Sequence, residues 1–128
     1  MEIEIKKQPT NRSSLLNVAV ESLEKFKAQD IVKIDLSGKT SIADFMLIAS
    51  GTSSRQIRAM AEHTVTMIKK NIKAPVNIEG LSQGDWVLID SGDIIIHLFR
   101  PEVREFYNLE KMWQINSIQD TKIENLEI

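Results

Sequence analysis

Residues 85–99 read DWVLIDSGDIIIHLF and contain two strand-like runs, 85–90 and 93–99, which are separated only by Ser91 and Gly92. Two such runs joined by two residues that include a glycine are typical of a β-hairpin. A two-residue turn also predicts which side chains lie opposite one another across the hairpin. The predicted pairs are Asp90 with Asp93, Leu88 with Ile95, and Trp86 with His97.

The two faces of this hairpin differ in chemistry, because side chains alternate along a strand. One face is entirely aliphatic and is expected to be core: Val87, Ile89, Ile94, Ile96 and Leu98. The other face mixes apolar, acidic and imidazole side chains: Trp86, Leu88, Asp90, Asp93, Ile95 and His97. Carboxylates cost free energy when they are buried without partners, so we expect this second face to be only partly covered by the chain itself.

Helices and strands are predicted on both sides of the hairpin. Apolar residues recur at helical spacing in residues 15–26, behind a cap at Ser13 or Ser14, and again in residues 57–72. Strand-like runs cover 30–36, 44–50 and 76–79. A last helix begins at Pro101, and its apolar stripe is predicted to be Val103, Phe106, Leu109 and Trp113. The order predicts an α/β fold with a mixed five-stranded sheet and helices packed on it.

The ordered domain is expected at residues 13–113, after a flexible leader at 1–12 and before a loose C-terminal tail at 114–128. The chain has 128 residues and no cysteine, which excludes a disulfide scaffold, a thiolate metal site and a cysteine nucleophile. No apolar run approaches the roughly 18 residues that a membrane span needs. The first residues resemble neither a secretory signal nor a transit peptide. We therefore expect a cytoplasmic protein without a membrane partner.

Charge is distributed unevenly along the chain, although the formal net charge is only −2. Residues 1–78 carry 12 basic and 8 acidic side chains, whereas residues 79–110 carry 2 basic and 7 acidic ones. Five of the seven aromatic residues lie in or just after the acidic stretch. An acidic, aromatic-rich region suits a basic protein partner better than a nucleic-acid backbone, so little direct nucleic-acid contact is expected.

Several linked motifs resemble one known family. They are SGTSSRQ at 50–56, EG at 79–80, DWVLIDSGD at 85–93 and RPEVREFYNLEKMW at 100–113, together with DIV at 30–32 and TSIAD at 40–44. In this order and spacing the chain resembles the Iojap-related ribosomal silencing factor family (RsfS) from about residue 15 to residue 113. Departures from the family pattern are mild. Phe45 lies where the family has Tyr or Phe, and Arg100 lies where Gln is more usual.

The resemblance implies a non-enzymatic translational repressor without a cofactor. Such proteins bind the large ribosomal subunit, chiefly through ribosomal protein fourteen of that subunit, and block joining of the small subunit during starvation. The resemblance further implies a nucleotidyltransferase-like topology and homodimerisation of the free protein.

An alternative function is a catalytically inactive nucleotidyltransferase-fold module that binds a nucleotide or an RNA phosphate at the Gly51 loop. Active nucleotidyl transfer would need two acids that alternate on a strand to hold Mg²⁺, but Ile95 stands two residues after Asp93. Ser53, Ser54 and Arg55 are the candidates for contacting an anion or a partner at this loop, whereas a capped helix start, with Ser53 paired to Gln56, is the structural explanation.

A third hypothesis is RNA contact through Lys69, Lys70 and Lys73.

Trp86 is the residue most expected to anchor a partner, because tryptophan is enriched at the energetic centres of protein interfaces. The other candidate partner-binding residues are Leu88, Asp90, Asp93, Ile95, His97 and Tyr107. The structural alternative is that the last helix covers Trp86 within the same molecule. For His97, no serine or acidic partner is spaced for catalysis, so a paired or partner-contacting histidine is favoured.

Overall fold

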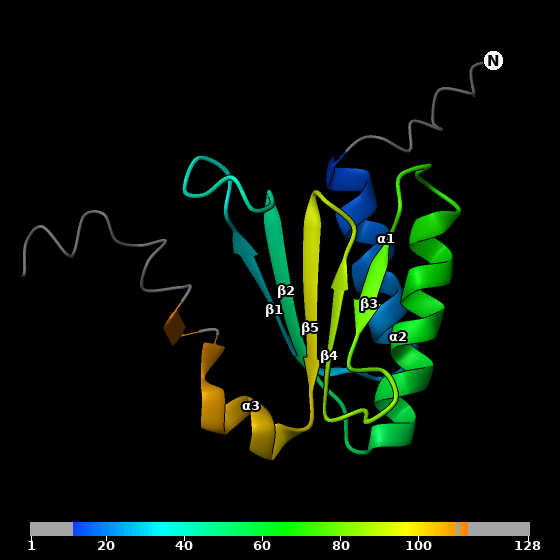
Figure 1. Cartoon of the computed structure of the whole chain (residues 1–128), viewed down its shortest axis with the longest axis vertical. Coiled ribbons are helices and arrows are strands. Elements are labelled where there is room, and N and C mark those ends of the chain that lie inside the picture. The colour runs from blue at the N-terminus through cyan, green and yellow to red at the C-terminus, as the bar shows by residue number, and fades with distance from the viewer. Residues whose placement is uncertain (1–11, 110, 113–128) are drawn as a thin grey trace, which may run out of the picture.

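The computed structural model describes residues 12–109 and 111–112. Within these residues, three helices and five strands follow one another in the predicted order (Figure 1). The helices are α1 (Arg12–Lys25), α2 (Ser54–Lys69) and α3 (Pro101–Tyr107); the strands are β1 (Gln29–Asp35), β2 (Phe45–Ser50), β3 (Asn77–Glu79), β4 (Trp86–Asp90) and β5 (Ile94–Phe99). Apart from Arg12, the predicted leader lies outside the described residues, as does the predicted tail.

The five strands form one mixed sheet in the order β1-β2-β5-β4-β3. β2 and β5 pair in parallel, and the other three neighbouring pairs are antiparallel. The expected mixed five-stranded α/β fold is therefore confirmed. β3, a short strand that follows Pro75, lies at the edge of the sheet, where a strand that begins next to a proline loses no ladder hydrogen bond.

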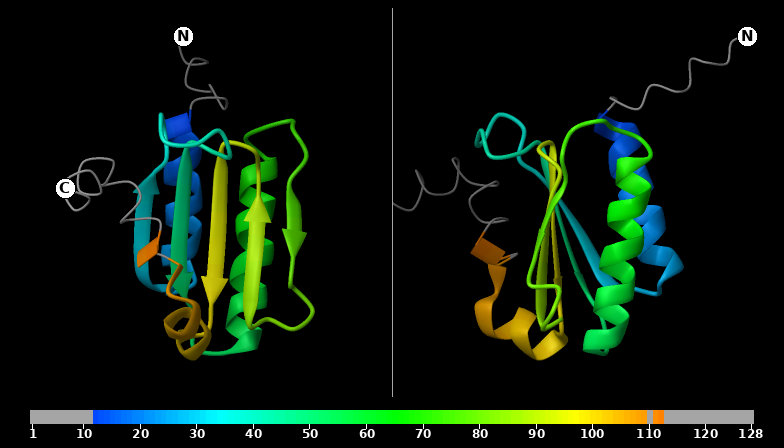
Figure 2. Two further views of the ribbon diagram at one scale, coloured as in Figure 1. Left: turned by 60° about the vertical axis from the view of Figure 1, so that its left-hand side comes forward. Right: turned by 45° about the vertical axis from the view of Figure 1, so that its right-hand side comes forward.

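The helices cover the sheet unequally. α1 and α2 pack side by side on one face, whereas the short α3 lies on the other face at one end of the strands (Figure 2). We call these faces the α1/α2 face and the α3 face. The aliphatic hairpin face predicted as core lies under α1 and α2, and all five of its side chains are fully buried: Val87, Ile89, Ile94, Ile96 and Leu98.

The hairpin has a longer turn than the sequence suggested, so the predicted pairs are wrong by two residues. Asp90 lies opposite Ile95, Leu88 opposite His97, and Trp86 opposite Phe99. The turn leaves residues 91–93 outside both strands, and Gly92 adopts a φ of +94° within it. A shift of two residues preserves the pleat, which is why the pairs changed while the strand residues kept their predicted faces. Asp93 is the exception, because it was predicted on the second face opposite Asp90 and lies in the turn.

The sequence predicted serine N-caps at the starts of two helices, and the structure confirms one of them. α1 begins at Arg12, so Ser13 and Ser14 lie within its first turn rather than before it, and that cap prediction is wrong. At α2 the Ser53 side chain accepts a hydrogen bond from the Gln56 N–H (3.1 Å), as predicted. The return bond differs by one residue, because Gln56 Oε1 accepts from the Thr52 N–H (2.6 Å) rather than from that of Ser53.

The stripe predicted for the last helix is only partly correct. Val103 and Leu109 pack against the α3 face of the sheet, but the Phe106 side chain is 79% exposed. The helix ends at Tyr107 because Asn108 adopts a left-handed conformation with a φ of +49°. Trp113, predicted as the end of the stripe, lies outside the described residues.

Within the described part of the chain, no helix combines the length and apolar character needed to cross a membrane.

Candidate functional site

The candidate site lies on the α3 face, where β4 meets α3. Trp86 and Leu88 of β4 are half-buried, and Tyr107 of α3 is 52% exposed. Five other apolar residues of this face, from β1, β2 and β5, are almost fully covered: Ile34, Met46, Ile48, Ile95 and Phe99. Val32 of β1 is half-buried. Apart from Val32, the accessible apolar side chains that the strands contribute to this face are therefore Trp86 and its neighbour Leu88.

Three aromatic rings extend from this point toward solvent. The Trp86 ring lies 4.8 Å from the Tyr107 ring, and the Tyr107 ring lies 4.9 Å from that of Phe106 in an edge-on arrangement. We call Trp86, Phe106 and Tyr107 the aromatic patch. Exposed neighbouring aromatic rings are uncommon on a monomer and are typical of surfaces that another molecule covers.

A second layer of rings supports the patch from below. Phe99 is fully buried and lies 4.9 Å from Trp86, and it stacks on His97 at 5.9 Å with an interplanar angle of 7°. Phe99 was missed in the sequence analysis, although the alternation of β5 places it on the same face as Ile95 and His97. This layer limits how far the Trp86 ring can move.

A hydrogen bond fixes the indole of Trp86. Its Nε1–H donates to Nδ1 of His97 over 3.0 Å. An indole N–H can only donate, so Nδ1 must accept and a neutral His97 carries its proton on Nε2. Burial lowers the pKa of His97 from 6.5 to about 4, which keeps the ring neutral near pH 7. His97 is thus a paired histidine, as expected, and its ring is only 9% exposed.

α3 covers one side of Trp86 without enclosing it. The Arg100 guanidinium, at the start of α3, pairs with Asp85 (3.4 Å) and with Glu102. Arg104 donates to the Ser50 side chain at the end of β2 (2.7 Å). These bonds hold α3 at one end of the sheet, and Trp86 remains half-buried beside it.

A small pocket opens beside Trp86. Its volume is about 250 Å³, and it is lined by Glu79, Gly80, Trp86, Leu88 and His97. Gly80 has a φ of +83°, and a Cβ there would lie 2.2 Å from the carbonyl oxygen of Trp86. Only glycine therefore allows the β3–β4 connection to pass so close to the strand that carries Trp86.

The two predicted acids lie at the other end of the hairpin from Trp86. Asp90 is four residues further along β4, a distance of about 13 Å at the usual rise per residue. Its Oδ1 accepts a hydrogen bond from the Gly92 N–H (2.9 Å). Asp93 is exposed in the turn itself. The acids therefore flank the face at a distance and do not surround the indole.

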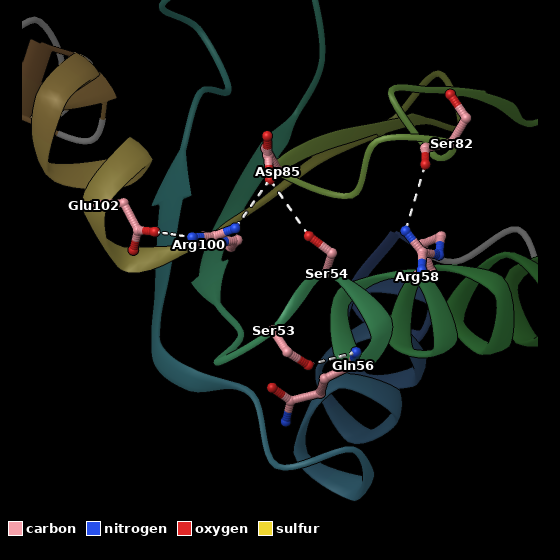
Figure 3. A network of polar contacts seen from close by, with 8 residues as sticks. All are labelled: Ser53, Ser54, Gln56, Arg58, Ser82, Asp85, Arg100 and Glu102. Atoms are coloured by element: carbon pink, nitrogen blue, oxygen red, sulfur yellow. Dashed lines mark hydrogen bonds and ion pairs between the residues drawn. The ribbon is translucent and has the colours of Figure 1, made fainter.

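The Gly51 turn is arranged as a structural helix start (Figure 3). The N–H groups of Gly51 and Thr52 already have partners, namely the Phe99 carbonyl (3.0 Å) and Gln56 Oε1 (2.6 Å). The Ser54 hydroxyl donates to the Asp85 carboxylate (3.4 Å), which places a negative charge beside the helix N-terminus. Bound N–H groups and a nearby carboxylate both disfavour a phosphate at this turn.

The second histidine is part of the contact between α1 and α2. The Ser22 hydroxyl lies 2.8 Å from His63 Nδ1 and 2.7 Å from the Thr64 hydroxyl. The His63 ring also packs on Phe26 at 5.0 Å. Across the described residues, no group of three or more His, Cys, Asp or Glu side chains is placed to hold a metal ion.

Comparisons with known proteins agree in sequence and in fold. Residues 9–127 match the protein-family model described as "Ribosomal silencing factor during starvation". A ribosomal silencing factor from Zymomonas mobilis is 53% identical over 109 residues, which cover 85% of this chain and 82% of that protein. One from Haemophilus influenzae is 42% identical over 100 residues, covering 78% and 98% of the two chains. A crystal structure of a protein from Chromobacterium violaceum has a TM-score of 0.77 at 34% identity, over 81% of this chain and 87% of that one.

Proposed function

The chain belongs to the ribosomal silencing factor family (RsfS), and from this premise we propose that it represses translation in the cytoplasm by occupying the large ribosomal subunit. It binds through ribosomal protein fourteen of that subunit and covers the surface that the small subunit must meet, which lowers translation during starvation. The effect depends on occupancy, so the proposal involves no catalytic step.

The aromatic patch is the observation that carries the proposal. Trp86 has a large apolar ring, a fixed orientation and a half-exposed surface, which together suit an interface anchor. The other two members of the patch, Phe106 and Tyr107, are exposed large hydrophobics. Covering these rings would remove apolar area from water, at about 25 cal/mol per Å².

The charges around the patch favour a basic partner. Glu79 lines the pocket beside Trp86, and Glu102 and Glu105 are exposed on α3. Asp90 extends the acidic border toward the far end of the hairpin. Acidic groups around an apolar centre speed association with a basic surface and disfavour acidic competitors.

The same patch offers a contact for a second copy of the chain. A free protein that exposes three neighbouring rings gains free energy by burying them against a partner. We propose that the free protein forms a homodimer through the aromatic patch and that the dimer separates when the ribosomal surface is bound.

Co-sedimentation with purified large subunits tests the proposed function. We expect the wild-type protein to bind large subunits and to prevent their joining with added small subunits. Trp86→Ala should weaken binding about 30-fold, which corresponds to about 2 kcal/mol. Phe106→Ala should also weaken binding, and this variant cannot act through the core because the Phe106 side chain is 79% exposed.

A matched control separates the patch from general destabilisation. Val65→Ala removes half-buried apolar atoms from α2 on the α1/α2 face and should leave binding unchanged. Circular dichroism should show that all variants are folded. Wild-type protein that fails to bind large subunits would contradict the proposed function, and normal binding by both patch variants would move the site elsewhere.

A further inference from the structure

A cleft lies at the opposite end of the sheet from α3. It opens between the C-terminal end of α2 and the β4–β5 turn, which lie together at the end of the sheet that is uppermost in Figure 1. Its volume is about 720 Å³, within the usual range for small-ligand sites. Its lining includes Lys69, Lys70, Ile72, Lys73, Ala74 and Asp93.

Three lysine side chains make this cleft basic. Lys69, Lys70 and Lys73 are exposed, and their ammonium groups make no ion pair or hydrogen bond with the part of the chain that the structure describes. The C-terminal end of α2 contributes about half a negative charge, and Asp93 contributes one. The three ammonium groups exceed both, so the cleft has a net positive charge and attracts an anion.

The β4–β5 turn adds a hydrogen-bond acceptor to this cleft, and two further lining residues add apolar surface. The Asp93 side chain is exposed, while its backbone carbonyl accepts hydrogen bonds from the N–H groups of Asp44 (2.8 Å) and Phe45 (3.2 Å), which fix the turn. A carboxylate cannot hold a phosphate, but it can accept a hydrogen bond from a ribose hydroxyl. Ile72 and Ala74 provide apolar surface against which a base can pack.

We propose that this cleft binds single-stranded RNA. The lysines contact backbone phosphates, Asp93 accepts a hydrogen bond from a ribose 2′-hydroxyl, and an unpaired base packs against Ile72 and Ala74. The carboxylate is the reason to favour RNA over DNA, since a purely basic cleft would bind both alike. The site is independent of the aromatic patch. The cleft is formed by the end of α2 and the β4–β5 turn, whereas the patch is carried by the start of β4 and by α3. Figure 1 shows these elements at opposite ends of the sheet.

Fluorescence anisotropy with a labelled ten-nucleotide RNA and the DNA of the same sequence tests the proposal over a range of salt concentrations. We expect the wild-type protein to prefer the RNA. The triple variant K69Q/K70Q/K73Q should raise the Kd for RNA about tenfold or more at low salt. It should also lower the slope of log Kd against log salt concentration by about two, because fewer counterions are released from the RNA. Asp93→Ala removes a negative charge, so the readout is the RNA-to-DNA affinity ratio, which should fall toward one.

A charge-matched triple variant, K25Q/K27Q/K33Q, is the control, because it removes three exposed positive charges that belong to neither this cleft nor the Gly51 loop. It should retain the wild-type RNA affinity. An equal or larger loss of RNA affinity in this control would overturn the proposed RNA site. Wild-type protein that does not bind the RNA at low salt would overturn it as well. Trp86→Ala should bind the RNA normally, so failure of this inference and failure of the proposed ribosomal docking are distinguishable.

Discussion

Among single residues, His97 links the stability of the fold to the orientation of Trp86. Its Nδ1 accepts the indole N–H (3.0 Å), and it can do so only while the ring is neutral. Protonation would remove this acceptor and leave a charge on a side chain that is 9% exposed. Burial lowers the pKa of His97 to about 4, because protonating the ring inside the folded protein is unfavourable.

We predict a loss of stability in mild acid that depends on His97. The unfolded chain binds the proton near pH 6.5 and the folded chain only near pH 4, so the unfolded state holds more protons between these values. The contribution of His97 is therefore complete above pH 6.5 and declines by about 3 kcal/mol as the pH falls to 4. Urea unfolding at pH 7 and pH 4 measures it.

Two variants isolate that contribution. His97→Gln should show a smaller difference between pH 7 and pH 4 than the wild-type protein, by about 3 kcal/mol. His63→Gln removes the other histidine, between α1 and α2, and should retain the wild-type difference. A difference that is the same in His97→Gln and in the wild type would show that the acid sensitivity arises elsewhere.

Among the helices and strands, the start of α2 permits a direct choice between a structural cap and an anion site. Ser53 accepts the Gln56 N–H (3.1 Å). Ser53→Ala should lower the free energy of unfolding by about 1 kcal/mol, whereas Ser53→Asp should retain most of it because aspartate is also a good cap. Both should bind large subunits normally. If Ser53→Asp bound large subunits more weakly while remaining stable, an anion contact at this turn would be supported instead.

The order of the elements could be predicted from the sequence because each one has its own periodic signal. The alternation in residues 85–99 assigned the strand residues 86–90 and 94–98 to the correct faces, whereas Phe99 was not assigned and Asp93 lies in the turn. The alternation has a period of two, so it does not distinguish pairings that differ by two residues. The length of the turn determines which residues pair, and the turn is longer than the sequence suggested. For α3, the helical spacing suggested that Phe106 was buried. The helix instead turns Val103 and Tyr107, four residues apart, toward the sheet and leaves Phe106 in solvent.

For the whole molecule, the location of the accessible surface depends on how many helices cover each face. In the described part of the chain, two helices pack on the α1/α2 face and one short helix packs on the α3 face. Local sequence patterns do not predict this difference in coverage. The sequence could therefore predict that Trp86 and Tyr107 were candidates for binding. It could not predict that Tyr107 would contact Trp86 or that Phe99 would support both, because these contacts join β4, β5 and α3.

The last prediction concerns competition between two partners for one surface. If dimer and ribosome both cover the aromatic patch, they exclude each other, and the fraction of silenced subunits depends on protein concentration. The chain has no cysteine, so Glu24→Cys introduces a single labelling site on the exposed side of α1, away from the patch. A mixture of donor-labelled and acceptor-labelled protein should show energy transfer when free and lose it when excess large subunits are added.

The variant Trp86→Ala sharpens that test, since it should weaken both contacts. Carrying the same labels, it should show little energy transfer at concentrations at which the wild-type protein shows it clearly. Val65→Ala, altered on the α1/α2 face, should behave like the wild type. Energy transfer that persists in protein co-sedimenting with large subunits would mean that a dimer binds intact, and the dimer contact would then have to lie on a face other than the aromatic patch.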